Sequence, residues 1–112
     1  MDCLFCKIIN GDIPSSKVYE DDTVFAFRDI EPQAPVHILI IPKQHIKSAA
    51  EITSENSSVV AHIFEVAAKI AESEGLTDGY RIVNNCGDSA GQTVKHLHFH
   101  LMGGRAFTWP AG

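Results

Sequence analysis

The sequence is poor in positive charge. Only 9 of its 112 residues are lysine or arginine, against 14 aspartates and glutamates, so the formal net charge is −5. A protein that binds DNA or RNA through its phosphates needs a basic face. We therefore expect no nucleic acid polymer as a partner. A small nucleotide can still bind, because backbone N–H groups and a few side chains are enough to hold its phosphates.

Long apolar runs and a leader segment are also missing. No stretch approaches the ~20 apolar residues of a membrane span. The start, Met1-Asp2-Cys3, lacks the basic and apolar regions of a signal peptide. The sequence has 3 cysteines, an odd number, and nothing in it indicates export. We expect no membrane partner and a cytoplasmic protein whose thiols are reduced or bound to metal.

Length and composition are those of one ordinary domain. Hydrophobic residues make up 45% of the chain and charged residues 21%, which is typical of a globular protein. We expect a single domain over residues 1–112, large enough for a core but small for an enclosed active site. A symmetric dimer would supply additional walls.

Hydrophobic patterning predicts one long helix among short strands. From about Ser54 to Glu74, apolar residues recur at steps of three and four, and Gly75 suits the end of a helix. One or two helical turns are expected over residues 3–9. Strands are expected over residues 17–20, 24–28, 36–41, 80–84 and 96–102. The predicted fold class is α+β, an antiparallel sheet of about five strands with the long helix across one face and a short N-terminal helix.

The most informative segment is His96-Leu97-His98-Phe99-His100-Leu101-Met102, in which imidazoles alternate with apolar side chains. In a strand, this spacing places the three imidazoles on one face and buries Leu97, Phe99 and Leu101 on the other. Imidazoles titrate near neutral pH and can act as nucleophile, base, acid or metal ligand. A purely structural role is disfavoured, because each buried, unsatisfied ring nitrogen costs on the order of 1–3 kcal/mol.

The same run resembles the signature of the histidine triad (HIT) family, His-φ-His-φ-His-φ-φ with φ apolar, at every position. Other segments resemble the Hint branch of that family: Asp12-Ile13-Pro14, 25–30, 32–37, 41–46, Gly91-Gln92-Thr93 and 103–110. This branch consists of homodimeric, purine nucleotide-binding hydrolases that split nucleoside phosphoramidates. The resemblance therefore implies a HIT-like fold, a purine nucleotide as the small-molecule ligand and a homodimer.

The resemblance also implies roles for the histidines. His98 attacks the α-phosphorus and forms a transient nucleotidyl-histidine, while its other ring nitrogen donates to a backbone carbonyl on the same strand. His100 donates to the phosphate oxygens as charge builds. His96 completes the triad, and His37 lies behind the site in the proton path. A core histidine bonded to the backbone is the alternative for His37.

Further residues match the nucleotide-binding positions of the branch. Asp29 would accept hydrogen bonds from the ribose hydroxyls, and Asn85 would lie near the α-phosphate. The remaining expected contacts are Ile13, Phe27 and Ile30 for the base, and Gly91, Gln92 and Thr93 for the phosphate or leaving group. The alternative for the three apolar residues, and for Ile30 above all, is ordinary core packing. The alternative for residues 91–93 is a plain turn.

One cysteine pair, Cys3-x-x-Cys6, cannot fill a tetrahedral metal site by itself. The resemblance implies that His45 and His96 complete a structural zinc site with Cys3 and Cys6. Two free thiols in a helical turn are the alternative. No catalytic metal is expected.

Three other functions compete with phosphoramidate hydrolysis. The first is a metalloenzyme with one ion on His96, His98 and His100, although neighbours on one strand face are spaced too widely to share an ion at ~2 Å. The second is hydrolysis of dinucleoside polyphosphates. The third is a nucleotide-binding regulatory or scaffold protein. The tail Trp109-Pro110-Ala111-Gly112 resembles the Hint C-terminus and favours phosphoramidates.

Overall fold

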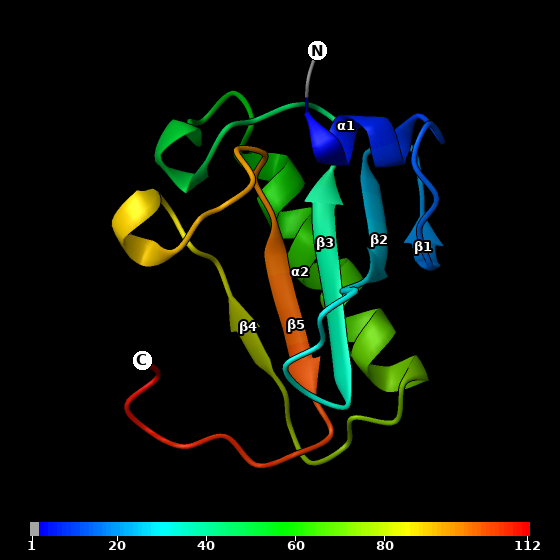
Figure 1. Cartoon of the computed structure of the whole chain (residues 1–112), viewed down its shortest axis with the longest axis vertical. Coiled ribbons are helices and arrows are strands. Elements are labelled where there is room, and N and C mark those ends of the chain that lie inside the picture. The colour runs from blue at the N-terminus through cyan, green and yellow to red at the C-terminus, as the bar shows by residue number, and fades with distance from the viewer. Residues whose placement is uncertain (1–2) are drawn as a thin grey trace.

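The computed structural model describes residues 3–112, so the predictions for Met1 and Asp2 lie outside it. Five strands form one antiparallel sheet in the order β1-β2-β3-β5-β4. The helix α2 crosses one face of this sheet, and the short helix α1 lies at one end of the other face (Figure 1). The bounds are α1 Leu4–Ile9, β1 Lys17–Glu20, β2 Val24–Arg28, β3 Val36–Pro42, α2 Ser57–Ser73, β4 Arg81–Val83 and β5 Phe99–Gly103. The predicted α+β class, with about five strands and a long and a short helix, is confirmed.

The central strand β3 explains how the two faces of the sheet differ. It pairs with β2 on one side and β5 on the other, and six of its seven residues are buried. Because successive side chains alternate, Ile38 and Ile40 face α2, whereas His37, Leu39 and Ile41 lie on the opposite face. The polar side chain of His37 therefore points away from α2.

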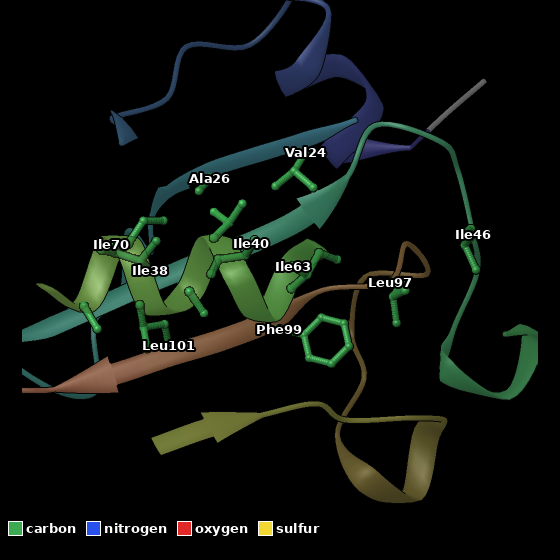
Figure 2. Close-up of a cluster of buried hydrophobic side chains, with 13 residues drawn as sticks. Val24, Ala26, Ile38, Ile40, Ile46, Ile63, Ile70, Leu97, Phe99 and Leu101 are labelled. Atoms are coloured by element: carbon green, nitrogen blue, oxygen red, sulfur yellow. The ribbon is translucent and has the colours of Figure 1, made fainter. Parts of the chain in front are cut away.

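The main core fills the space between the sheet and α2 (Figure 2). From β5 and the residues before it, Leu97, Phe99 and Leu101 are buried against this helix, as predicted. The α2 residues in the core recur at helical spacing because one stripe of the helix faces the sheet. They are Ile63, Val66, Ala67, Ile70 and Ala71.

The opposite face of the sheet is only partly covered. Phe5 and Ile8 of α1 pack there on Phe25, Phe27 and other apolar residues of β2 and β3. A helix of six residues cannot cover a five-stranded sheet, so the rest of this face is left for a cavity.

Several predicted boundaries differ from the structure by one residue, and two differ by three. The long helix begins at Ser57 rather than Ser54, because the Asn56 side chain accepts from the Thr53 amide (2.7 Å) and holds a preceding turn. The strand predicted from His96 begins only at Phe99. The Leu97 amide donates to the Ile46 carbonyl (2.6 Å), outside the sheet, so the chain before Phe99 does not follow the β ladder.

Within residues 3–112, no helix is both long and apolar enough to cross a bilayer.

Candidate active site and metal centre

A cavity of about 490 Å³ opens on the sheet face opposite α2. Its walls come from α1, β2, β3, β5 and the loops around them, and apolar surface dominates. Most of the predicted site residues line it: Ile13, Phe27, Asp29, Ile30, His37, Thr93, His98 and His100. The cavity wall does not include Asn85, Gly91, Gln92 or His96. The structure therefore brings the apolar residues, the carboxylate and three of the imidazoles to one place.

The ring of His98 is held in one tautomer. Its Nδ1 lies 2.8 Å from the backbone carbonyl of His96, and a carbonyl can only accept, so Nδ1 carries the proton. In the neutral ring, Nε2 then keeps its lone pair. Burial lowers the pKa of His98, whose exposed fraction is 6%. His98 is thus a neutral imidazole with a lone pair, the form that can act as a nucleophile.

A chain of hydrogen bonds sets the tautomers of His37 and His100. The Gln33 amide donates to His37 Nδ1 (2.9 Å), so the proton of neutral His37 is on Nε2. His37 Nε2 lies 2.8 Å from His100 Nδ1, which must therefore accept, and His100 carries its proton on Nε2. His37 is thus more than a core histidine bonded to the backbone, because its second nitrogen fixes the ring of His100.

Burial keeps both of these rings neutral. It lowers the pKa of His37, and the carboxylate of Asp29, 3.5 Å from His37 Nε2, opposes this shift without overcoming it. Burial, assisted by the neighbouring His98 and His37 rings, lowers the pKa of His100 to about 4. The rings of His98 and His100 lie side by side, with centroids 5.2 Å apart. At neutral pH a lone pair and an N–H donor therefore stand next to each other at the cavity wall.

The first histidine of the triad belongs to a different cluster. His96 Nδ1 lies 3.3 Å from Cys3 Sγ and 3.6 Å from Cys6 Sγ. His45 Nδ1 lies 3.1 Å from His96 Nδ1 and 3.4 Å from Cys6 Sγ. A tetrahedral ion with bonds of about 2.0–2.3 Å would separate its ligand atoms by roughly 3.3–3.8 Å. The four side chains predicted to bind zinc therefore come together in a geometry that fits such an ion.

The tautomer of His96 supports this fit. Its Nε2 lies 2.8 Å from the Pro42 carbonyl, so Nε2 carries the proton and the Nδ1 lone pair points at the two sulfurs. A ring N–H held by a carbonyl is the usual support of a metal-binding histidine.

Asp29, His37 and His100 form a second group of possible metal ligands among the described residues. Here the Gln33 amide keeps a proton on His37 Nε2, the nitrogen that faces the other two ligands. This group therefore presents an N–H where a metal needs a lone pair. The triad cannot share one ion either, because the Nδ1 of His96 is directed into the cysteine cluster. The donor chemistry thus favours a metal at the cysteines and disfavours one in the cavity.

The Gln92 side chain differs from the sequence expectation. Its amide oxygen accepts from the Gly87 amide (2.9 Å), and its amide nitrogen donates to the carbonyls of Lys47 (2.8 Å) and Val94 (3.0 Å). The residue is only 4% exposed. Because its hydrogen bonds are used within the protein, the side chain braces the loop before His96 and does not face the cavity.

The sequence reasoning missed several supporting residues. Phe5 packs edge-to-face on both His98 (centroids 5.1 Å apart) and His96 (5.9 Å), so it lies between the cysteine cluster and the cavity. The Asn84 side-chain amide donates to the His98 carbonyl (2.9 Å) and anchors the residue before β5. Gln33 and Pro42 act through backbone groups. The contacts of Phe5, Asn84 and Pro42 have no local sequence signal, because they join chain segments that meet only in the fold. Gln33 is only four residues from His37, but it acts through its backbone amide, which has no side-chain signature.

Comparisons with known proteins agree with this geometry. The HIT domain family model matches residues 10–107. The purine nucleoside phosphoramidase of Escherichia coli K12 is 52% identical over 103 residues, covering 91% of this chain and 87% of that protein. The 14 kDa zinc-binding protein of Zea mays is 50% identical over 111 residues, covering 97% of this chain and 87% of that protein.

A solved structure extends the likeness to three dimensions. The crystal structure of a HIT family hydrolase from Legionella pneumophila is 51% identical, with a TM-score of 0.97, and the match covers 99% of this chain and 100% of that one. The chain therefore belongs to the histidine triad, or HIT, family.

Proposed function

We propose that this protein is a Hint-like hydrolase that splits purine nucleoside 5′-phosphoramidates through a covalent nucleotidyl-histidine. The observation that carries the proposal is the lone pair on His98 Nε2 beside the Nε2–H donor of His100 in one cavity. The 52% identity to a purine nucleoside phosphoramidase supports this class of substrate.

In the first step, His98 Nε2 forms a bond to the α-phosphorus as the P–N bond breaks. The electron pair of that bond goes to the amine nitrogen, which takes a proton from water and departs. His100 Nε2–H donates to a phosphoryl oxygen, where negative charge builds, and His37 holds the ring of His100 in the donating tautomer. In the second step, the hydroxide left by that proton transfer attacks phosphorus. The His98–phosphorus bond breaks, and its electron pair returns to Nε2.

The cavity walls suggest how the nucleotide binds. Asp29 Oδ1 accepts from the Glu31 amide (2.8 Å), and Oδ2, which lies 3.5 Å from His37 Nε2, would accept from a ribose hydroxyl. Ile13 and Phe27 would hold the base, and Ile30, which is 94% exposed, would cover it from the rim. Thr93 would contact the phosphate or leaving group. We expect Asn85 and Gly91 to lie near the phosphate of the bound nucleotide. Gln92 would act only by shaping their loop.

We further propose a structural zinc ion on Cys3, Cys6, His45 and His96. Such an ion would pin α1 to the chain before β5 and supply no chemistry to the reaction. The support is the convergence of four ligand atoms and the identity to a zinc-binding protein. Metal analysis of protein purified without chelator should find one zinc per chain, and far less would contradict the proposal.

A homodimer of this single domain is proposed as the working form. The strand β4 is an edge of the sheet, paired on one side with β5, and Trp109 in the tail is 84% exposed. A second copy would cover such surfaces. Light scattering should give twice the chain mass of 12.2 kDa, and a monomer at micromolar concentration would contradict the dimer.

The enzymatic proposal is tested with a fluorogenic adenosine phosphoramidate. We expect turnover, and a rapidly quenched reaction should contain protein that is heavier by one adenylyl group. The phosphoramidate should react with a kcat/KM at least about tenfold above that of a dinucleoside polyphosphate, because the cavity is proposed to accept an amine leaving group. Faster cleavage of the polyphosphate would contradict the substrate class. Nucleotide binding without an adduct or turnover would point to a regulatory protein.

A further inference from the structure

The C-terminal tail meets the loop that carries the Gln33 amide. β5 ends and β3 begins at the same end of the sheet, where Val36 is opposite Gly103 (Figure 1). Gly104 has a φ of +88°, and a Cβ there would lie 2.9 Å from the Pro35 side chain. Glycine therefore lets the tail turn closely against the β2–β3 loop.

Arg105 connects the tail to this loop by hydrogen bonds. Its Nε and one terminal nitrogen donate to the Gln33 carbonyl, at 3.3 and 3.0 Å. Its guanidinium also stacks on Phe107, 4.2 Å from the ring centroid, which restricts its orientation. The Gln33 side chain donates to the Glu31 carbonyl (3.0 Å). Residue 33 is thus held through its carbonyl and its side chain, while its amide is bonded to His37 Nδ1.

We propose that Arg105 and Gln33 are positioning residues, which hold the Gln33 amide on His37 and so keep the Nε2–H of His100 directed at the reacting phosphoryl group. This inference rests on the proposed function. The path runs from the Arg105 guanidinium to the Gln33 carbonyl, then from the Gln33 amide to His37 Nδ1, and from His37 Nε2–H to His100 Nδ1.

The path matters because a neutral imidazole has two tautomers. Without a donor at Nδ1, His37 could carry its proton on that nitrogen and accept through Nε2. His100 would then donate through Nδ1 to His37, and its Nε2 would present a lone pair to the phosphate. The phosphate would then face the lone pairs of His98 Nε2 and His100 Nε2, instead of one lone pair and one N–H. A shift of the loop would therefore remove transition-state stabilisation without removing any group that touches the nucleotide.

The test compares Arg105→Ala with Arg81→Ala. Arg81 also stacks on Phe107 (5.0 Å) and donates to the tail at the Thr108 carbonyl (2.9 Å), but it forms no hydrogen bond to Gln33. It is thus a matched control for a general loosening of the tail. Both arginines are at least partly solvent-accessible, and neither lines the nucleotide cavity.

For Arg105→Ala we expect kcat to fall roughly tenfold with KM within about twofold, because the interaction acts mainly in the transition state. Long-range ¹H–¹⁵N spectra should show the pattern of Nε2–H tautomers for His37 and His100 in the wild type and a mixed pattern in this variant. Arg81→Ala should keep the wild-type spectra and kcat. Arg105→Lys, which can still donate to the Gln33 carbonyl, should recover most of the loss.

Unchanged nitrogen spectra in Arg105→Ala would overturn the inference, whatever happens to activity. An equal loss of kcat in Arg81→Ala would also overturn it, because a loosened tail would then explain the effect. If the wild-type protein hydrolyses no phosphoramidate, the proposed function fails, and the spectra still decide whether Arg105 sets the tautomers.

Discussion

His96 and His98 are two residues apart, yet their rings are held in opposite tautomers. The Pro42 carbonyl holds the Nε2–H of His96 and leaves Nδ1 for the cysteine cluster. The His96 carbonyl holds the Nδ1–H of His98 and leaves Nε2 for the cavity. The residue type is the same, and what differs is which ring nitrogen meets a backbone acceptor. A histidine motif therefore acquires its function from the carbonyls around it.

The cysteine cluster and the cavity are connected through residues that contact both. His96 supplies the carbonyl that orients His98, and Phe5 contacts both rings. A metal that fixes His96 and α1 would thus stabilise the support of the nucleophile without taking part in the reaction.

The largest effect is expected from removing His98, the proposed nucleophile. His98→Ala should lower turnover of the phosphoramidate by at least about a thousandfold and abolish the adenylyl adduct, because no other group can attack phosphorus at that position. Calorimetry with AMP should show that the variant still binds nucleotide. An adduct that persists in His98→Ala would place the covalent bond on another residue.

Removal of the proposed zinc ion should mainly reduce stability. Stripping zinc with a chelator should lower the free energy of unfolding by about 4 kcal/mol, the effect of a ligand present at a thousand times its dissociation constant. Cys6→Ser should show little further loss on chelation, because one ligand is already missing. Hydrolysis by the folded, stripped protein should continue at a reduced rate. Complete dependence of turnover on metal would instead support a catalytic ion.

A smaller loss is expected from the loop brace. Gln92→Leu leaves the Gly87 amide and the Lys47 and Val94 carbonyls without their partner, and should destabilise the protein by about 1–3 kcal/mol. Thr93→Val is the matched comparison, because Thr93 lines the cavity. It should alter KM or kcat with little change in stability. If Gln92→Leu instead altered KM or kcat, and Thr93→Val instead reduced stability, Gln92 would belong to the nucleotide site.

The smallest predicted effect concerns acid. The pKa of His100 is about 4 in the folded protein and about 6.5 in the unfolded chain, so the unfolded state binds more protons between these values. Stability should therefore fall as pH decreases from about 6.5 to 4. Urea unfolding should be compared for the metal-free wild type and His100→Gln. Between pH 6.5 and 4, the wild type should lose about 1–2 kcal/mol more of its free energy of unfolding than the variant, after allowing for the partial exposure of His100. An equal pH dependence in the two proteins would contradict the neutral state of the half-buried His100.

Periodicity was a good guide to the elements but not to their ends. Alternation of apolar side chains correctly predicted the burial of Leu97, Phe99 and Leu101. It also extended the last strand to His96, because the pattern continues after the ladder hydrogen bonds have stopped. The hydrogen bond from Leu97 to Ile46 joins segments about fifty residues apart, and no local pattern reports it.

The candidate site divides in the same way. Motif resemblance identified the four residues of the cysteine cluster and half of the residues that line the cavity. It could not show that Gln92 is turned inward, since a glutamine beside a glycine-rich loop suits either orientation. It also missed Gln33, whose contribution is a backbone amide. Backbone donors carry no side-chain signature, so only the folded chain reveals them.

Long-range ¹H–¹⁵N correlation spectra of His96 and His98 in the zinc-loaded protein at neutral pH would examine the two rings directly. Our account predicts a protonated Nδ1 and an unprotonated Nε2 in His98, with the reverse arrangement in His96. A proton on His98 Nε2 would leave no lone pair to attack phosphorus and would contradict the account.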